Sequence, residues 1–237
     1  MSKLFSPKPT SSYTRPDLVR LPALTRTRKI IRWLLRGVVR IFVWSIIRLR
    51  VEGLENVPSH GPALLVSNHL GDADVIVGLA ATPAYFEILG KIELYDFPIV
   101  GCLMDAYGTI WVHRGQPDRR AIRAVLSGLA EGRMVAIAPE GRESLSGALE
   151  QGTGGAAYIA LKADVPVIPI GLTGTENMKI YPDLKRFRRT PVSVKIGKPF
   201  RLKIYENRRQ SIQKGTERIM QSLAQLLPSE YRGVYGD

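Results

Sequence analysis

A histidine and an aspartate five residues apart are the residues most able to do chemistry in this chain. His69 and Asp74 follow the apolar run 63–66, which indicates a buried strand. An imidazole in the turn after a strand can act as a general base that a carboxylate in the next helix orients. On a regular helix, residues five apart point about 140° away from each other. The pair can therefore meet only if His69 lies in the loop and the helix begins near residues 71–73, with Asp72 as its N-cap.

A second segment suited to binding a charged group spans residues 138–144, again directly after an apolar strand. Its turn contains Glu140, Gly141 and Arg142, and Ser144 closes the segment with a hydroxyl. Backbone N–H groups and a guanidinium in such a turn can bind a phosphate. The alternative is an ordinary strand-to-loop turn with an exposed arginine.

Two further segments complete the set of candidates. Residues 108–114 indicate a strand that ends in Arg114, which is either a second phosphate clamp or a solvent-facing arginine in a turn. Residues 165–170 contain no ionisable group and indicate a core strand with rigid proline edges. Asn68, directly before His69, is an additional polar candidate at the first turn.

These segments are positioned by an alternation of strands and helices beyond residue 51. Apolar runs predict strands at 63–67, 85–89, 109–113, 134–138, 167–172 and 192–196. Helical periodicity predicts helices at 72–80, 98–106, 117–131, 154–163 and 208–227. The alternation predicts an α/β fold with a central, mostly parallel sheet flanked by helices.

The positive charge of the chain is concentrated at its start. The net charge is +13 over 237 residues, yet residues 1–50 contain twelve Lys and Arg and one acid, so the rest of the chain carries only +2. We predict a poorly ordered tail over residues 1–24, basic amphipathic helices over 25–50, and one near-neutral domain over 51–237.

The basic arm has the composition of helices that lie in a membrane interface. Arg28, Arg32, Arg36 and Arg40 recur every four residues among large aliphatic residues and tryptophans. The alternative is a helix packed on its own domain with its arginines in water. A spanning helix is not expected, because a bilayer core needs about 20 mostly apolar residues and the longest uncharged run is 41–47.

Several other classes of site find no support in the sequence. The single cysteine, Cys102, excludes an intrachain disulfide, and no secretory signal is visible. The three histidines are widely spaced, so no metal site is expected, and no GxSxG nucleophile elbow occurs. The basic run 185–189 is predicted as a solvated loop, with a lipid-headgroup contact as the alternative.

The four segments occur in the order NHxxxxD, GxIxVxR, PEGxxS and VPVIPI, beginning at residues 68, 108, 139 and 165. In this order they resemble the glycerolipid acyltransferase superfamily, and most closely the bacterial 1-acyl-glycerol-3-phosphate acyltransferases. The resemblance covers about residues 51–237. It implies that His69 is the catalytic base and that Asp74 supports it. It further implies that Arg114, Glu140 and Gly141 bind the acceptor phosphate, that the fourth block forms an acyl or acceptor pocket, and that the N-terminal helices associate with the membrane.

The chain departs from the family pattern at two places. The common form of the third block is EGTRS, whereas here Arg142 stands one place early and Glu143 takes the usual arginine position. Many relatives also carry Phe-Lys before a glycine, where this chain has Gly152 and Thr153. Lys91 can supply positive charge in place of that lysine, or it is simply an exposed lysine at a helix start.

The expected protein is a peripheral or monotopic enzyme on the cytoplasmic face of the membrane that transfers a fatty acyl chain to 1-acyl-glycerol-3-phosphate. The donor is an acyl thioester, either acyl-CoA or acyl carrier protein, and no metal or organic cofactor is expected. Glycerol-3-phosphate or another lysophospholipid is the alternative acceptor. A basic arm that binds nucleic acid is the rival from another class, but the aliphatic and tryptophan content of the arm favours lipid.

Overall fold

The computed structural model describes residues 15–113 and 118–236, and its centre is a seven-stranded sheet. The strands lie in the order β1-β7-β6-β2-β5-β3-β4, and all neighbours are parallel except β6 and β7. Their bounds are β1 (Ile47–Glu52), β2 (Ala63–Ser67), β3 (Phe86–Lys91), β4 (Ile110–Val112), β5 (Met134–Ile137), β6 (Val167–Thr173) and β7 (Thr190–Ile196). The predicted α/β fold with a mostly parallel sheet is confirmed.

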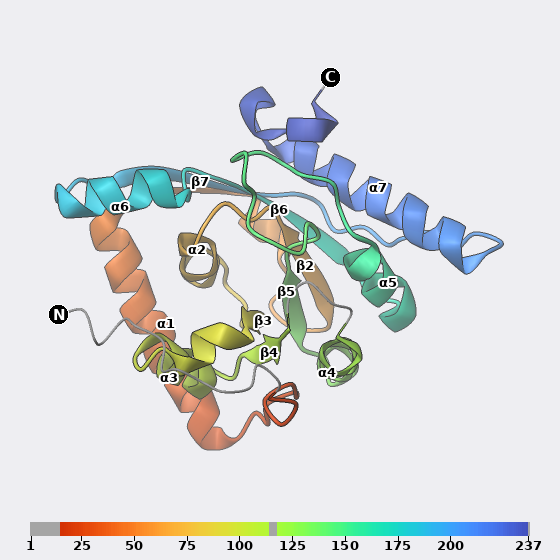
Figure 1. Cartoon of the computed structure of the whole chain (residues 1–237), viewed down its shortest axis with the longest axis horizontal. Coiled ribbons are helices and arrows are strands. Elements are labelled where there is room, and N and C mark those ends of the chain that lie inside the picture. Colours follow the sequence, from red (N-terminus) through yellow and green to blue (C-terminus); the bar gives the residue numbers. More distant parts are fainter. Residues whose placement is uncertain (1–14, 114–117, 237) are drawn as a thin grey trace.

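Helices cover both faces of this sheet (Figure 1). They are α1 (Arg26–Ile46), α2 (Ala73–Ala81), α3 (Val100–Tyr107), α4 (Arg119–Ala130), α5 (Gly154–Ala163), α6 (Asn177–Lys185) and α7 (Arg208–Leu226). Strand β2 is buried on both sides, because Leu65 packs with the α1 and α2 side chains while Leu64 and Val66 pack with α4, α5 and α7. Two hydrophobic cores therefore sandwich one sheet.

Two elements of the fold were not predicted from the sequence. Residues 47–52 form the edge strand β1, paired in parallel with β7, although the helical arm was predicted to run to residue 50. Helix α6 was missed because it is short and contains Pro182. The predicted loop at 185–189 begins with the last residue of α6, and Phe187 after it is 98% exposed.

Part of the predicted disordered tail is packed, which corrects the prediction for residues 15–24. Val19 is buried in a small core, and the carbonyl of Pro22 accepts a hydrogen bond of 2.8 Å from Arg133. Arg15 forms an ion pair of 3.0 Å with Asp96. Apolar side chains and two arginine contacts therefore tie this stretch to the domain. The rest of the predicted tail, residues 1–14, lies outside the described residues.

Helix α1 is one continuous helix, and two of its arginines, Arg32 and Arg36, are buried against the domain, which corrects for these two the alternative that placed the arginines in water. Arg32 is buried and binds both carboxylate oxygens of Glu87 on β3, at 2.9 and 2.6 Å. Its Nε donates to the carbonyl of Tyr107, whose ring lies under the guanidinium. Burial of the Tyr107 phenol raises its pKa to about 12.

Helix α1 has apolar side chains toward the core and toward the outside. Val43 is buried, and Leu35, Val39 and Ile46 pack against the core. Seven other apolar side chains of α1 are exposed by 45% or more, which is unusual for a surface helix. They are Ile30, Trp33, Leu34, Val38, Ile41, Phe42 and Trp44. In the described part of the chain, no helix is both long and apolar enough to cross a membrane.

Candidate active site

The histidine and aspartate of the first block meet directly after β2. His69 lies in the loop, α2 begins at Ala73, and the Nδ1 of His69 is 2.7 Å from Oδ2 of Asp74. The same oxygen accepts hydrogen bonds from the backbone N–H groups of Leu70 (2.7 Å) and Gly71 (3.1 Å). Three donors on one buried carboxylate oxygen hold the imidazole in a fixed orientation.

Asp72 occupies the N-cap position of α2, as predicted, but its side chain makes no capping hydrogen bond. Its carboxylate instead accepts a hydrogen bond of 2.7 Å from the hydroxyl of Tyr181 on α6. That hydrogen bond, together with burial, raises the pKa of Tyr181 to about 12. Asp74, two residues further on, is the aspartate that accepts hydrogen bonds from backbone N–H groups before the helix, those of Leu70 and Gly71.

Glu140 of the third block is hydrogen-bonded to the first block. Its side chain is buried, and its two oxygens accept hydrogen bonds from the backbone N–H of His69 (3.2 Å) and of Glu150 (2.8 Å). Burial raises the pKa of Glu140 despite these N–H groups. Gly141 takes a left-handed conformation with φ of 78°, which a side chain would strain. Ser144 completes the junction, because its N–H donates to the His69 carbonyl at 2.8 Å.

An apolar cavity of about 730 Å³ opens at the dyad. It lies at the carboxyl ends of β2, β5, β3 and β4, where ligands bind in open parallel sheets. His69 and Asp74 line it together with Gly141 and Arg142, and most of the remaining wall is apolar. Representative wall residues are Leu65, Ile88, Val125, Ala136, Ile159 and Ile170. Ile170 places the fourth sequence block at this cavity.

A second histidine and aspartate of the same spacing also line the cavity. The Nδ1 of His113 lies 3.1 Å from Oδ2 of Asp118, while Oδ1 of Asp118 caps α4 by accepting from the N–H groups of Arg120 and Ala121. Burial favours the neutral acid, but the N–H groups and His113 outweigh it, so the pKa of Asp118 lies below its usual value. The repeated five-residue spacing was the signal in the sequence that could have found this pair.

Comparison with known proteins identifies the family. The family model described as Acyltransferase matches residues 48–173, more than half of the chain and the part that carries all four blocks. The chain belongs to the acyltransferase family. The resemblance to acyltransferases stated from the sequence is thereby confirmed.

Individual relatives of this acyltransferase have related names. It is 33% identical over 138 residues to "1-acyl-sn-glycerol-3-phosphate acyltransferase LPAT1, chloroplastic" of Arabidopsis thaliana, covering 57% of this chain and 38% of that protein. It is 28% identical over 155 residues to the 1-acyl-sn-glycerol-3-phosphate acyltransferase of Borreliella burgdorferi, covering 62% and 60%. The matches therefore span less than two thirds of the length of these curated relatives.

A solved structure shares the fold of the acyltransferase over most of its length. The 1-acyl-sn-glycerophosphate acyltransferase PlsC from Thermotoga maritima aligns with a TM-score of 0.63 and 25% identity. The alignment covers 86% of this chain and 84% of that protein. The likeness thus includes the sheet and helices on both sides of the dyad.

The shifted arginine of the third block lines the cavity but has an acidic partner. Nη2 of Arg142 lies 2.7 Å from Oε2 of Glu150, and the Arg142 side chain is 60% exposed. Glu143, which takes the usual arginine position, accepts a hydrogen bond of 3.1 Å from the amide of Asn177 on α6. The amide oxygen of Asn177 accepts from the N–H of Asp72 at 3.0 Å. Asn177 therefore bridges the two loops. This role was missed in the sequence because α6 was not predicted.

The remaining candidates are placed away from the dyad or outside the described residues. Asn68 is buried and exchanges two hydrogen bonds with the backbone of Leu172, so its side chain fastens β2 to β6. Lys91 is 3.7 Å from Glu93 at the surface and does not line the cavity. Arg114 lies outside the described residues.

Proposed function

We propose that this acyltransferase moves a fatty acyl chain from an acyl thioester to the free hydroxyl of 1-acyl-glycerol-3-phosphate, giving phosphatidic acid for phospholipid synthesis. The names of the relatives support this acceptor. The observation that carries the proposal is the His69–Asp74 pair, 2.7 Å apart at the opening of a large apolar cavity. The apolar cavity wall can hold a fatty acyl chain, and the His69 imidazole can remove the proton of the acceptor hydroxyl.

The chemistry follows from the orientation of the imidazole. With Nδ1–H donated to Asp74, Nε2 of His69 accepts the proton of the acceptor hydroxyl as its oxygen attacks the thioester carbonyl. The new C–O bond forms first, and the C–S bond breaks when the tetrahedral intermediate collapses. The imidazolium returns its proton to the departing thiolate. Because a thioester is already activated, the reaction needs no resident cofactor.

We place the acceptor phosphate near Arg142, the described cation that shares the cavity wall with the dyad. Arg142 would exchange Glu150 for the phosphate, since guanidinium groups bind phosphate with paired hydrogen bonds. The acyl chain of the donor would occupy the apolar part of the cavity, between α2, α4 and α5.

We further propose that the enzyme works at a membrane surface. The exposed apolar side chains of α1 form one outward face, and a soluble domain rarely leaves so many large apolar groups uncovered. Such a face, on a helix that the buried Arg32 and Arg36 hold to the domain, can enter the headgroup boundary.

The proposal is tested by replacing His69 with alanine and measuring transfer of a labelled acyl group from acyl-CoA to a panel of glycerol phosphates. We expect H69A to lose at least about a hundredfold in kcat, as general-base catalysis contributes that much, and to keep the thermal stability of the wild type. The wild type should prefer 1-acyl-glycerol-3-phosphate over glycerol-3-phosphate. Retention of most turnover by a folded H69A variant would contradict the assigned role.

A further inference from the structure

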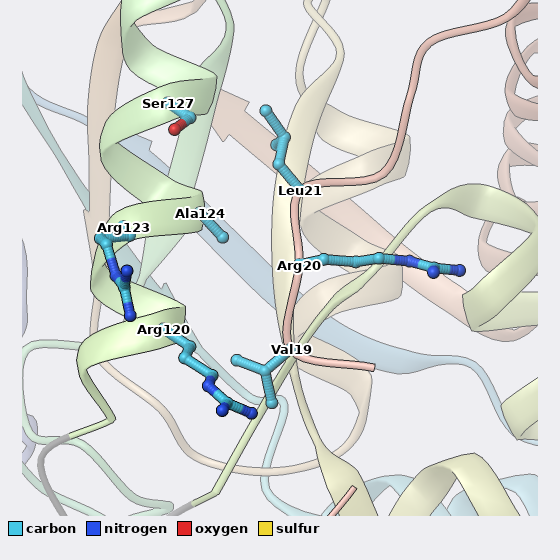
Figure 2. A pocket seen from close by; sticks show the side chains of 7 residues that line it. All are labelled: Val19, Arg20, Leu21, Arg120, Arg123, Ala124 and Ser127. Atoms are coloured by element: carbon cyan, nitrogen blue, oxygen red, sulfur yellow. The ribbon is translucent and has the colours of Figure 1, made fainter. Parts of the chain in front are cut away.

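A second hollow lies on the outer side of α4, remote from the dyad. It has a volume of about 340 Å³ and runs between α4 and the packed stretch 19–21 (Figure 2). We call it the strap groove, and its lining residues are Val19, Arg20, Leu21, Arg120, Arg123, Ala124 and Ser127. Val19 and Ala124 are buried beneath it, and the exposed arginine side chains stand at its borders.

We call residues 15–22 the strap. This segment forms one wall of the groove and is held at both ends. Arg15 at its start pairs with Asp96 at 3.0 Å, and Arg133 donates a hydrogen bond of 2.8 Å to the Pro22 carbonyl at its end. Between these anchors, Leu21 packs so closely on α4 that a Cβ added at Gly128 would meet it at 3.2 Å. The groove is therefore a preformed surface.

The three arginines of the strap groove have no acidic partner among the residues that the structure describes. Arg120 stands in the first turn of α4, where the helix dipole disfavours a cation, and Arg123 follows in the second turn. They are exposed, as is Arg20. Unpaired positive groups in a position unfavourable for folding suggest that an external anionic surface is their counterpart.

The groove and the catalytic cavity share α4 as a wall. Ala121, Ile122 and Val125 line the catalytic cavity, whereas Arg120 and Arg123 line the groove on the same helix. A helix with its side chains is about 10–12 Å across. A partner seated in the groove is thus one helix away from the site where the thioester must react.

We propose that the strap groove docks an acidic acyl carrier protein and presents its acyl thioester to the cavity across the N-terminal end of α4. The inference rests on the proposed function, because it names the partner that delivers the donor. Arginine is enriched at protein interfaces, and the three exposed arginines are complementary to an acidic surface. Opposite charge across such an interface speeds association and selects the partner.

The spread of the arginines favours a protein over a single phosphate group. In Figure 2 Arg20 extends away from α4, whereas Arg120 lies beside Val19 and Arg123 projects from the helix elsewhere. Side chains that diverge in this way cannot close around one phosphate, but they can contact acidic residues spaced along a partner. The nucleotide phosphates of CoA and anionic lipid headgroups are the rival occupants, and the test separates them.

The test compares two donors with the same palmitoyl chain, one on acyl carrier protein and one on CoA. The groove variant R120E/R123E is set beside the control K203E/R209E, which makes the same charge change on exposed residues elsewhere. We expect the groove variant to lose about tenfold or more in kcat/KM for the carrier protein, through KM, in line with electrostatic steering. The kcat/KM of the groove variant with palmitoyl-CoA should stay within about twofold of the wild type. The kcat/KM of the control should stay within the same range with either donor.

Each other outcome overturns the proposal. An equal loss with both donors would indicate a small-molecule phosphate site, and lost binding to anionic vesicles with unchanged carrier kinetics would indicate a lipid contact. No change with either donor would show that the groove is idle. Thermal melts and the charge-neutral variant R120Q/R123Q, expected to show a smaller loss for the carrier protein, separate docking from misfolding.

The failure of the proposed function gives a different result. If the wild type transfers no acyl group from either donor, the proposed function fails, and the groove is then tested by titrating acyl carrier protein onto wild type and R120E/R123E. Turnover by the wild type with palmitoyl-CoA but none with palmitoyl carrier protein would overturn the docking proposal alone.

Discussion

At the scale of single residues, the carboxylate of Asp74 has two tasks at once. One oxygen holds the imidazole of His69 and also satisfies two backbone N–H groups of the loop that carries it. The tautomer of the base and the shape of its loop therefore depend on the same atom. Glu140 supports the loop from the other side through the His69 N–H.

We predict that replacing Asp74 with asparagine lowers kcat by about 10²–10⁴-fold. The neutral amide neither supports the imidazolium nor fixes the Nδ1–H tautomer, a change known to be costly in histidine dyads. KM for both substrates should change little, because the hydrogen bonds of Asp74 go to His69 and to the loop that carries it. Steady-state kinetics beside a thermal melt checks this, and a kcat within threefold of the wild type would contradict it.

At the scale of elements, α6 acts as a brace on two catalytic loops. Asn177 accepts from the N–H of Asp72 and donates to Glu143, so one amide spans the first and third blocks. Gly71 leaves room for it, since an added Cβ would come within 2.6 Å of the Asn177 amide oxygen. Glu143, the acid at the usual arginine position of the third block, thus has Asn177 as its hydrogen-bond partner.

We predict that Asn177→Ala lowers kcat about 10- to 100-fold with little change in KM, because the loop that aims His69 loses its brace. Asn177→Asp should be at least as harmful, since a second carboxylate would face Glu143. Adding Glu143→Gln to Asn177→Asp reverses donor and acceptor and should restore most of kcat. A purely general loss of stability would not be rescued in this way, and Gln213→Ala on the exposed face of α7 is the neutral control.

Helix α1 is fastened to the sheet by charge. Glu87 is 1% exposed and binds Arg32 through two hydrogen bonds, with Arg133 at 3.6 Å as a second cation. This pair joins the N-terminal helix to β3, across 55 residues of sequence. Removing one partner of a buried pair leaves the other charge without compensation.

We predict that Glu87→Gln lowers the free energy of unfolding by about 3–5 kcal/mol, the usual cost of breaking a buried ion pair. The control is Glu217→Gln, whose exposed pair with Lys214 at 3.3 Å should contribute at most about 1 kcal/mol. Equilibrium denaturation in urea measures both. A loss below about 1 kcal/mol for Glu87→Gln would show that α1 is held mainly by its apolar contacts.

At the scale of the whole molecule, the exposed apolar face of α1 continues toward the end of α6. The guanidinium of Arg189 lies 5.8 Å from the centre of the Trp44 ring, which places the basic run 185–189 beside the C-terminal end of α1 (Figure 1). Phe187 in this run is 98% exposed and Trp44 is 76% exposed. Aromatic groups among basic residues are typical of proteins that sit in a lipid interface.

We predict that the triple variant W33S/W44S/F187S loses at least about tenfold in affinity for phosphatidylglycerol vesicles. Each aromatic side chain that enters the interface contributes buried apolar area. The variant should keep its fold and its turnover of acceptor dispersed in detergent, because none of the three residues lines the cavity. Vesicle flotation measures the affinity, and unchanged flotation would place the membrane contact elsewhere.

The sequence by itself determined the parts of this protein that depend on neighbouring residues. The strand, turn and helix around His69 and Asp74 could be predicted because period, turn length and helix start are local properties. The spacing of five positions required a helix start near residues 71–73, and α2 begins at Ala73. The order of the four blocks indicated the family and the α/β fold.

Tertiary structure alone decided which distant groups meet. Nothing local shows that Glu87 is the partner of Arg32, that Asn177 reaches Asp72, or that residues 15–24 pack against α4. The direction of α1 was decided in the same way, since Arg32 meets the buried acid of β3 and Arg36 meets the Thr82 carbonyl after α2. Hydrogen bonds and ion pairs between segments far apart in the chain depend on how the whole sheet is assembled, and local periodicity carries no information about that assembly.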